Sequence, residues 1–173
     1  MLILVSGGAA SGKSEYAEGL ILQSGLTERL YVATMEVCDQ ESVRRVERHR
    51  ALRAGKGFRT AECPRGLEEL PPPGGGAVLL ECLSNLTANE CFGPRGFAGA
   101  AERILRGVRR LASGAELTVV VTNELFSDGV RYQEQVRQYL ETLAAVNRAL
   151  AAEADRVVEV VCGIPVDWKG AGR

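Results

Sequence analysis

Short apolar runs alternate along this chain with longer stretches in which apolar residues recur at helical spacing. Each run is rich in leucine or β-branched residues and is bounded by glycine, proline or charged residues. That is the pattern of strands buried on both faces of a parallel sheet. It predicts strands at 2–5, 29–34, 77–82, 117–122 and 157–161. Residues 58–62 are predicted as either a short further strand or an extended crossing segment.

The stretches between the strands have the periodicity of amphipathic helices. In residues 98–111 the apolar side chains lie on one side of a helix, at Ile104, Leu105, Val108 and Leu111. Further helices are predicted at 15–22, 39–53 and about 132–154, with a short one around Asn85 and Asn89. Strands that alternate with helices predict an α/β fold with a mostly parallel, doubly wound sheet and helices on both faces.

One segment carries a specific chemical signal. Residues Gly7 to Ser14 match G-x-x-x-x-G-K-[ST], and they follow a strand and open a helix, which is the context that this phosphate-binding loop (P-loop) requires. Gly7, Gly8 and Gly12 are expected to let the backbone take conformations that a Cβ would forbid, so that successive N–H groups converge on an anion. Lys13 would offer a charge to the β- and γ-phosphates, and the Ser14 hydroxyl would ligate Mg²⁺. The segment predicts a nucleoside triphosphate site.

A carboxylate at the end of the predicted strand 77–82 is a candidate for the metal side of this site. In P-loop proteins an acid at the carboxyl end of a strand beside the loop completes the Mg²⁺ site. Glu81 occupies that position. A strand-terminal glutamate that simply faces water fits the same pattern.

The predicted helix at 39–53 is rich in arginine and holds the one histidine of the protein, His49. Arg45, His49 and Arg53 follow one ridge of this helix, at i, i+4 and i+8. An imidazole between two guanidinium groups is expected to stay neutral and nucleophilic near pH 7, and the arginines would grip phosphate oxygens beside it. The spacing alone favours the alternative, a solvated basic helix with an incidental histidine.

Composition limits the remaining function classes. The net charge is −1, so no basic excess suggests nucleic acid, and no apolar run reaches the roughly 18 residues of a membrane span. Five scattered cysteines without C-x-x-C spacing argue against a disulfide framework or a zinc site. A strand that begins at residue 2 leaves no room for a signal peptide, so we expect a cytoplasmic protein. The connection at 64–76 is too short to link two domains, and 1–173 is predicted as one P-loop nucleotide-binding catalytic domain.

A P-loop alone does not distinguish a kinase from a switch GTPase, a motor or a nucleotidyltransferase. The chain has no N-K-x-D motif for base recognition, which disfavours the switch. Several of its motifs, taken together and in colinear order, resemble the bifunctional adenosylcobinamide kinase and adenosylcobinamide-phosphate guanylyltransferase family of cobalamin biosynthesis. They are Gly7–Ser14, Tyr31–Thr34, Arg45–Arg53, Phe58–Glu62, Leu79–Ser84 with Asn89, Val121–Glu124 and Ala154–Val166.

The resemblance implies a RecA-like P-loop NTPase fold and two activities. The enzyme would phosphorylate the hydroxyl of the aminopropanol arm of adenosylcobinamide with ATP or GTP. It would then transfer GMP from GTP, through a covalent GMP–histidine at the position of His49, to give adenosylcobinamide-GDP. The corrinoid would be its small-molecule partner, and a homotrimer its assembly.

The resemblance also implies which residues contact the guanine nucleotide. These are the P-loop residues Gly7, Gly8, Ala9, Ala10, Ser11, Gly12, Lys13 and Ser14, then Ala33, Thr34 and Met35, then Arg50, Ala51, Leu52 and Arg53, and finally Glu62 and Glu81.

Two other readings remain open on the sequence. The chain would be a P-loop kinase of another small hydroxyl compound if it turned over ATP without forming a covalent GMP. It would be a nucleotide-binding or assembly protein if it bound nucleotide and transferred nothing to a corrinoid.

Overall fold

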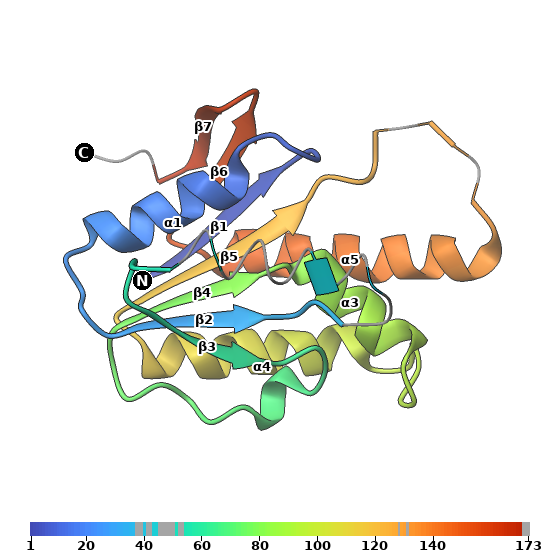
Figure 1. Cartoon of the computed structure of the whole chain (residues 1–173). Helices are drawn as coiled ribbons and strands as arrows, with labels where there is room; N and C mark the ends of the chain where they lie inside the picture. Colours follow the sequence, from blue (N-terminus) through green and yellow to red (C-terminus); the bar gives the residue numbers. More distant parts are fainter. Residues whose placement is uncertain are drawn as a thin grey trace.

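A seven-stranded sheet forms the centre of the structure, a computed structural model that describes residues 1–36, 40, 43–44, 51, 54–127, 129–130 and 132–170 (Figure 1). Its strands lie in the order β3-β2-β4-β5-β1-β6-β7. Neighbours pair in parallel except β6 and β7, which are antiparallel. The strands are β1 (Leu2–Gly7), β2 (Arg29–Ala33), β3 (Phe58–Glu62), β4 (Ala77–Glu81), β5 (Leu117–Asn123), β6 (Arg156–Val161) and β7 (Ile164–Lys169).

Helices cover both faces of the sheet, as Figure 1 shows, which confirms the predicted α/β class. One face packs against α1, and the other packs against α3, α4 and α5 together with a short 3₁₀ helix, η1. The helices are α1 (Lys13–Gln23), η1 (Leu67–Glu69), α3 (Leu83–Phe92), α4 (Ala100–Gly114) and α5 (Glu134–Glu153). Within the described ranges, no helix is long and apolar enough to cross a membrane.

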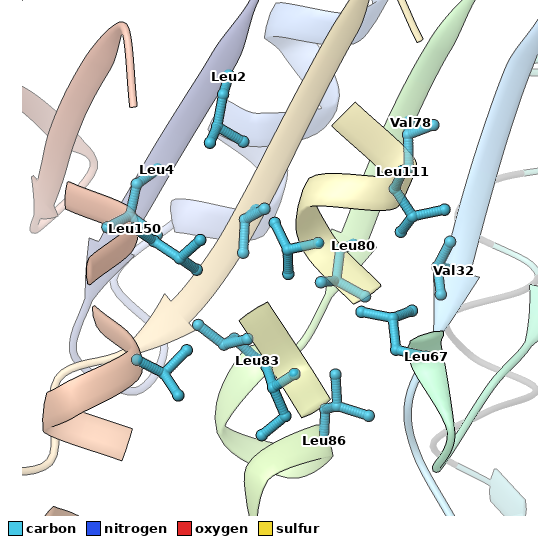
Figure 2. Close-up of a cluster of buried hydrophobic side chains, with 14 of the residues drawn as sticks. Leu2, Leu4, Val32, Leu67, Val78, Leu80, Leu83, Leu86, Leu111 and Leu150 are labelled. Atoms are coloured by element: carbon cyan, nitrogen blue, oxygen red, sulfur yellow. The ribbon is translucent and has the colours of Figure 1, made fainter. Parts of the chain in front are cut away.

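The alternation of side chains along each strand explains why the strands are apolar throughout. In β1, Leu2 and Leu4 join the core under α3, α4 and α5, whereas Ile3 and Val5 join the core under α1. Figure 2 shows the first of these cores, where Leu80 of β4 lies among leucines of the strands and helices. Burying each such side chain stabilises the fold by about 1.5–3 kcal/mol. A strand that is covered on both faces therefore needs apolar residues at successive positions.

The predicted strands are confirmed, and the segment at 58–62 is a full strand paired with β2. Sequence reasoning missed β7. Every residue of β7 is exposed, so no alternation of buried and exposed positions marks it, and it is held by pairing with β6 at the edge of the sheet. The predicted helix at 39–53 lies largely outside the described residues.

A buried carboxylate joins three elements on the α3–α5 face. Glu90 of α3 is 2% exposed. It accepts hydrogen bonds from the Gly66 N–H at 2.7 Å, from Arg103 Nε at 3.0 Å and from Arg95 Nη2 at 3.1 Å. Burial by itself would raise the pKa of Glu90, but the bonds from Gly66 and Arg103 and the charge of Arg95 hold that pKa below its usual range. Glu90 thus ties the loop before η1 to α3 and α4.

We expect Glu90→Gln to lower the free energy of unfolding by on the order of 3 kcal/mol, because it leaves the guanidinium of Arg103, which is 11% exposed, poorly compensated. Urea unfolding at pH 7 measures this loss. Glu134→Gln is the matched control, since Glu134 also pairs with an arginine but at an exposed position, and we expect it to change little. An equal effect of the two variants would contradict the assignment.

The sign of the pH dependence follows from the lowered pKa. The contribution of Glu90 to stability is complete above the unfolded pKa of about 4.3 and is lost as the pH falls through the lower folded value. Wild-type stability should therefore decline below about pH 4.3 more steeply than that of Glu90→Gln.

Candidate active site at the carboxyl edge of the sheet

The P-loop lies where the carboxyl ends of several parallel strands meet (Figure 1). Gly7 at the end of β1 is in register with Asn123 at the end of β5. Glu81 at the end of β4 is in register with Ala33 at the end of β2. Ligands of open α/β sheets bind in the crevice outside these strand ends. The register therefore collects predicted site residues of β1, β2 and β4, together with Asn123 of β5, at one edge.

The geometry of the loop requires glycine at two of its three glycine positions. A Cβ on Gly7 would lie 2.6 Å from both Ser11 Oγ and the Val160 carbonyl oxygen. Gly12, the residue before α1, has a left-handed φ of 90°. Gly8 was predicted to take a conformation that a Cβ would forbid, and that prediction is wrong. Its φ is not left-handed, and a Cβ there would meet no protein atom within 4 Å. Ala10 instead takes a left-handed conformation, with φ of 55°.

Lys13 and Ser11 are the two largely buried polar side chains of the loop. Lys13 is 8% exposed, and its ammonium donates to the Gly8 carbonyl oxygen at 2.9 Å, so its charge is held across the loop. The Ser11 hydroxyl is buried and has no hydrogen-bond partner among the described residues. A buried polar group without a partner is uncommon in folded proteins. Both side chains fit a loop that is completed by a bound phosphate.

The two residues predicted on the metal side contact each other. The Ser14 hydroxyl, in the first turn of α1, donates to Oε1 of Glu81. The Tyr31 hydroxyl donates to the other carboxylate oxygen, Oε2, at 3.3 Å. Glu81 therefore faces the P-loop. A hydroxyl and a carboxylate are the hard oxygen ligands that Mg²⁺ prefers.

These two side chains suit a magnesium ion that is also bound by phosphate and water oxygens. Among the described residues, no group of three or more histidine, cysteine, aspartate or glutamate side chains could hold a metal ion. Mg²⁺ commonly uses one or two protein ligands together with substrate phosphates, which is the arrangement that Ser14 and Glu81 offer.

A buried threonine fixes the ends of β2 and β4 to each other. The hydroxyl of Thr34 accepts from the Cys82 N–H at 2.7 Å and donates to the Cys82 carbonyl oxygen at 2.8 Å. Asn89 of α3 donates to the Thr34 carbonyl oxygen at 2.8 Å and to that of Pro64 at 2.9 Å. The side chain of Thr34 is thus engaged within the protein, while its neighbours Ala33 and Met35 remain partly exposed.

A second polar cluster joins the end of β5 to the start of α3. Asn123 Nδ2 donates to Ser84 Oγ at 2.7 Å and approaches Cys82 Sγ at 3.4 Å. Tyr139 of α5 donates its hydroxyl to the Ser84 carbonyl oxygen at 3.3 Å. Sequence reasoning did not assign these residues to the site, because the contacts join segments that are far apart in the chain. Only the Val121–Glu124 motif pointed to this strand end.

The remaining predicted residues fall into two groups. Glu62 ends β3, is exposed, and is in register with Ala33 at the same sheet edge. Ala51 is exposed. Four of the predicted residues lie outside the described part of the chain: His49, Arg50, Leu52 and Arg53. The structure thus brings together the P-loop, Glu81, Ala33–Met35 and Glu62, and the role of His49 stays a prediction.

Comparison with known proteins identifies the family of this chain. The family model for cobinamide kinase / cobinamide phosphate guanyltransferase, CobU, matches residues 3–168. The chain belongs to this family. It is 35% identical over 98% of its length to the bifunctional adenosylcobalamin biosynthesis protein CobU of Salmonella typhimurium, and the match covers 100% of that protein.

Two further relatives support the same family. The chain is 34% identical to the CobU protein of Escherichia coli, over 98% of this chain and 100% of that one. It is 33% identical to the CobP protein of Pseudomonas aeruginosa, over 96% of each. Among solved structures, the flagellar accessory protein FlaH of Methanocaldococcus jannaschii aligns with a TM-score of 0.48 and 13% identity, over 97% of this chain and 77% of that one.

The close approach at Gly7 predicts different outcomes for two neighbouring glycines. Gly7→Ala should lower the free energy of unfolding by about 2 kcal/mol, because the new methyl overlaps a backbone carbonyl that cannot move freely. Gly8→Ala should leave the melting temperature unchanged, since nothing lies within 4 Å of its Cβ. Thermal unfolding without nucleotide measures both. Equal destabilisation by the two variants would contradict this geometry of the loop.

Proposed function

We propose that this enzyme phosphorylates adenosylcobinamide and then guanylylates the product, using the P-loop in both steps. The observation that carries this proposal is the contact of Ser14 with Glu81 at the mouth of a P-loop, in a chain of the cobinamide kinase and guanyltransferase family. Nucleotide use follows from the loop and the family. The assignment of Mg²⁺ and of individual residues is part of the proposal.

In the kinase step, the hydroxyl oxygen of the aminopropanol arm attacks the γ-phosphorus of ATP or GTP. The bond from that phosphorus to the β–γ bridging oxygen breaks, the nucleoside diphosphate leaves, and the hydroxyl proton is released. Phosphoryl transfer of this kind depends mainly on positioning and charge neutralisation. The N–H groups of the loop and Lys13 supply both, because the ammonium is already held across the loop. Mg²⁺, held by Ser14 and Glu81, would neutralise charge on the phosphate oxygens.

In the transferase step, a ring nitrogen of His49 attacks the α-phosphorus of GTP and pyrophosphate leaves. A phosphate oxygen of adenosylcobinamide phosphate then attacks the same phosphorus, the bond to histidine breaks, and adenosylcobinamide-GDP is released. A neutral imidazole is required for the first attack, and neighbouring arginines favour that form. The P-loop would hold the leaving pyrophosphate through the donors that hold the β- and γ-phosphates in the kinase step.

The other predicted contacts complete the proposal. Ala33–Met35, Arg50–Arg53, Glu62 and Glu81 would surround the guanine nucleotide. A cytoplasmic homotrimer is the proposed working form, on the family resemblance, and sedimentation equilibrium of the purified protein tests its assembly.

The decisive experiment is to incubate the protein with Mg²⁺ and GTP labelled at the α-phosphate. We expect label on the protein that is labile to acid and stable to base, as a phosphoramidate should be. His49→Ala should lose at least about 99% of this label, because no other histidine exists to carry it.

The phosphorylation of adenosylcobinamide serves as the control for that variant. If His49→Ala retains the kinase step and loses the label, the two activities use different nucleophiles on one P-loop. Label that persists in His49→Ala would exclude His49 as the nucleophile. ATP-dependent phosphorylation without any covalent GMP would instead favour a plain P-loop kinase.

The contact of Ser14 with Glu81 predicts a specific change in magnesium dependence. Ser14→Ala and Glu81→Gln should each raise the Mg²⁺ concentration for half-maximal kinase activity by on the order of tenfold or more, because each removes one oxygen ligand. Glu116 is an exposed carboxylate at the amino end of β5, opposite the P-loop end of the sheet, and Glu116→Gln should leave this Mg²⁺ concentration unchanged. Titration of kinase activity with Mg²⁺ measures this, and unchanged midpoints in both variants would place the metal elsewhere.

A further inference from the structure

Three aromatic rings form a surface where α3 ends beside α5. Phe92, the last residue of α3, lies 5.3 Å from Phe97 in an edge-to-face arrangement and 6.2 Å from Tyr139 of α5, measured between ring centroids. Despite these contacts, Phe92 is 54% exposed. We call these three residues the aromatic surface. Apolar side chains that gather on one part of the surface mark binding sites more often than scattered ones do.

The aromatic surface is tied to the nucleotide edge of the sheet at two points. The hydroxyl of Tyr139 donates to the carbonyl oxygen of Ser84, which lies three residues after Glu81. Asn89, one helical turn before Phe92, donates to the carbonyl oxygen of Thr34 at the end of β2. The rise of an α-helix places Phe92 about 14 Å along α3 from its start at Leu83. The aromatic surface therefore lies about the length of one short helix from the strand end that carries Glu81.

We propose that the aromatic surface binds the corrin ring of adenosylcobinamide while the hydroxyl of its aminopropanol arm reaches the γ-phosphate at the P-loop. This inference rests on the proposed function. A corrinoid has a broad, conjugated ring with apolar faces, and its reacting hydroxyl stands on a flexible arm at the edge of that ring. It therefore needs a phosphate site and, some distance away, a wide apolar contact. Phe92 offers an exposed apolar ring at the far end of α3, and the half-buried rings of Phe97 and Tyr139 widen that contact.

The chemistry of Tyr139 suits this role. Burial raises the pKa of Tyr139 to about 12, with the nearby thiols of Cys82 and Cys91 adding to the effect. The phenol is therefore uncharged at neutral pH. Its hydroxyl is engaged by Ser84, so the ring contributes an apolar face and a fixed brace for Phe92.

The test compares Phe92→Ala with Trp168→Ala in the full-length protein, with adenosylcobinamide as the varied substrate of the kinase reaction. Trp168 is 70% exposed and lies on the edge strand β7, away from α3. It therefore controls for the loss of an exposed aromatic side chain. We expect Phe92→Ala to raise the KM for adenosylcobinamide about tenfold, with the KM for GTP and the covalent GMP label unchanged. Trp168→Ala should leave all three unchanged.

A second variant separates ring contact from helix integrity. Phe92→Tyr keeps the ring and should retain a KM for adenosylcobinamide close to that of the wild type. An unchanged KM in Phe92→Ala would overturn the corrin site while leaving the proposed function intact. A shift in oligomeric state with no specific change in corrinoid KM would overturn it in favour of an interface between copies of this chain. A wild-type protein that labels with GMP but does not phosphorylate adenosylcobinamide would remove the proposed substrate and this inference together.

Discussion

The parallel register of β2, β4, β5 and β1 is the constraint on which the site depends. Parallel pairing brings the carboxyl ends of all these strands to one edge, where the last residues of β4 and β5 make side-chain contacts. Glu81 reaches Ser14, and Asn123 reaches Ser84. A slip of one residue in β4 or β5 would turn the apolar side chains of that strand to the wrong face and move Glu81 or Asn123 out of its contact. The buried cores on both faces therefore fix the chemistry as well as the fold.

The strand ends are held by polar contacts that leave little freedom at the edge. Thr34 binds both backbone groups of Cys82, and Asn89 binds the backbone of Thr34 in turn. A loop that must present its N–H groups to phosphate gains from such a fixed surrounding, because preorganised donors need no rearrangement during the reaction. The P-loop itself is braced by the backbone bond from Gly163 to Ser11, which connects it to the turn between β6 and β7. β7, exposed on both sides, thus belongs to the β6–β7 hairpin, whose turn supports the loop.

The site and the aromatic surface together suggest a division of labour suited to a large substrate. Charged groups and backbone N–H donors gather at the P-loop end, where the proposed phosphoryl and guanylyl transfers take place. Apolar area gathers at the end of α3, where a bulky, weakly polar ring system would rest. Helix α3 spans the two, with its start beside Glu81 and its last residue in the aromatic surface. A rigid helix between the two contacts would set the distance between ring and reacting hydroxyl, which is how enzymes use remote binding to align a reaction.

The sequence by itself determined the P-loop, the family and every strand except β7. Each of these features depends on a short stretch of chain. A strand that is covered on both faces must be apolar throughout, and the loop motif lies between the first strand and the first helix. Tertiary structure decided what Glu81 does, because it meets Ser14 from 67 positions away, where the sequence also allowed a glutamate that faces water. It also decided that the hydroxyl of Thr34 bonds to the backbone of Cys82, and that Ala10 rather than Gly8 takes the left-handed conformation. The packing of α3 against α5 decided that Phe92 lies beside Tyr139. Local periodicity reflects neighbours in the chain, whereas these contacts depend on strand register and helix packing, which no single stretch of sequence encodes.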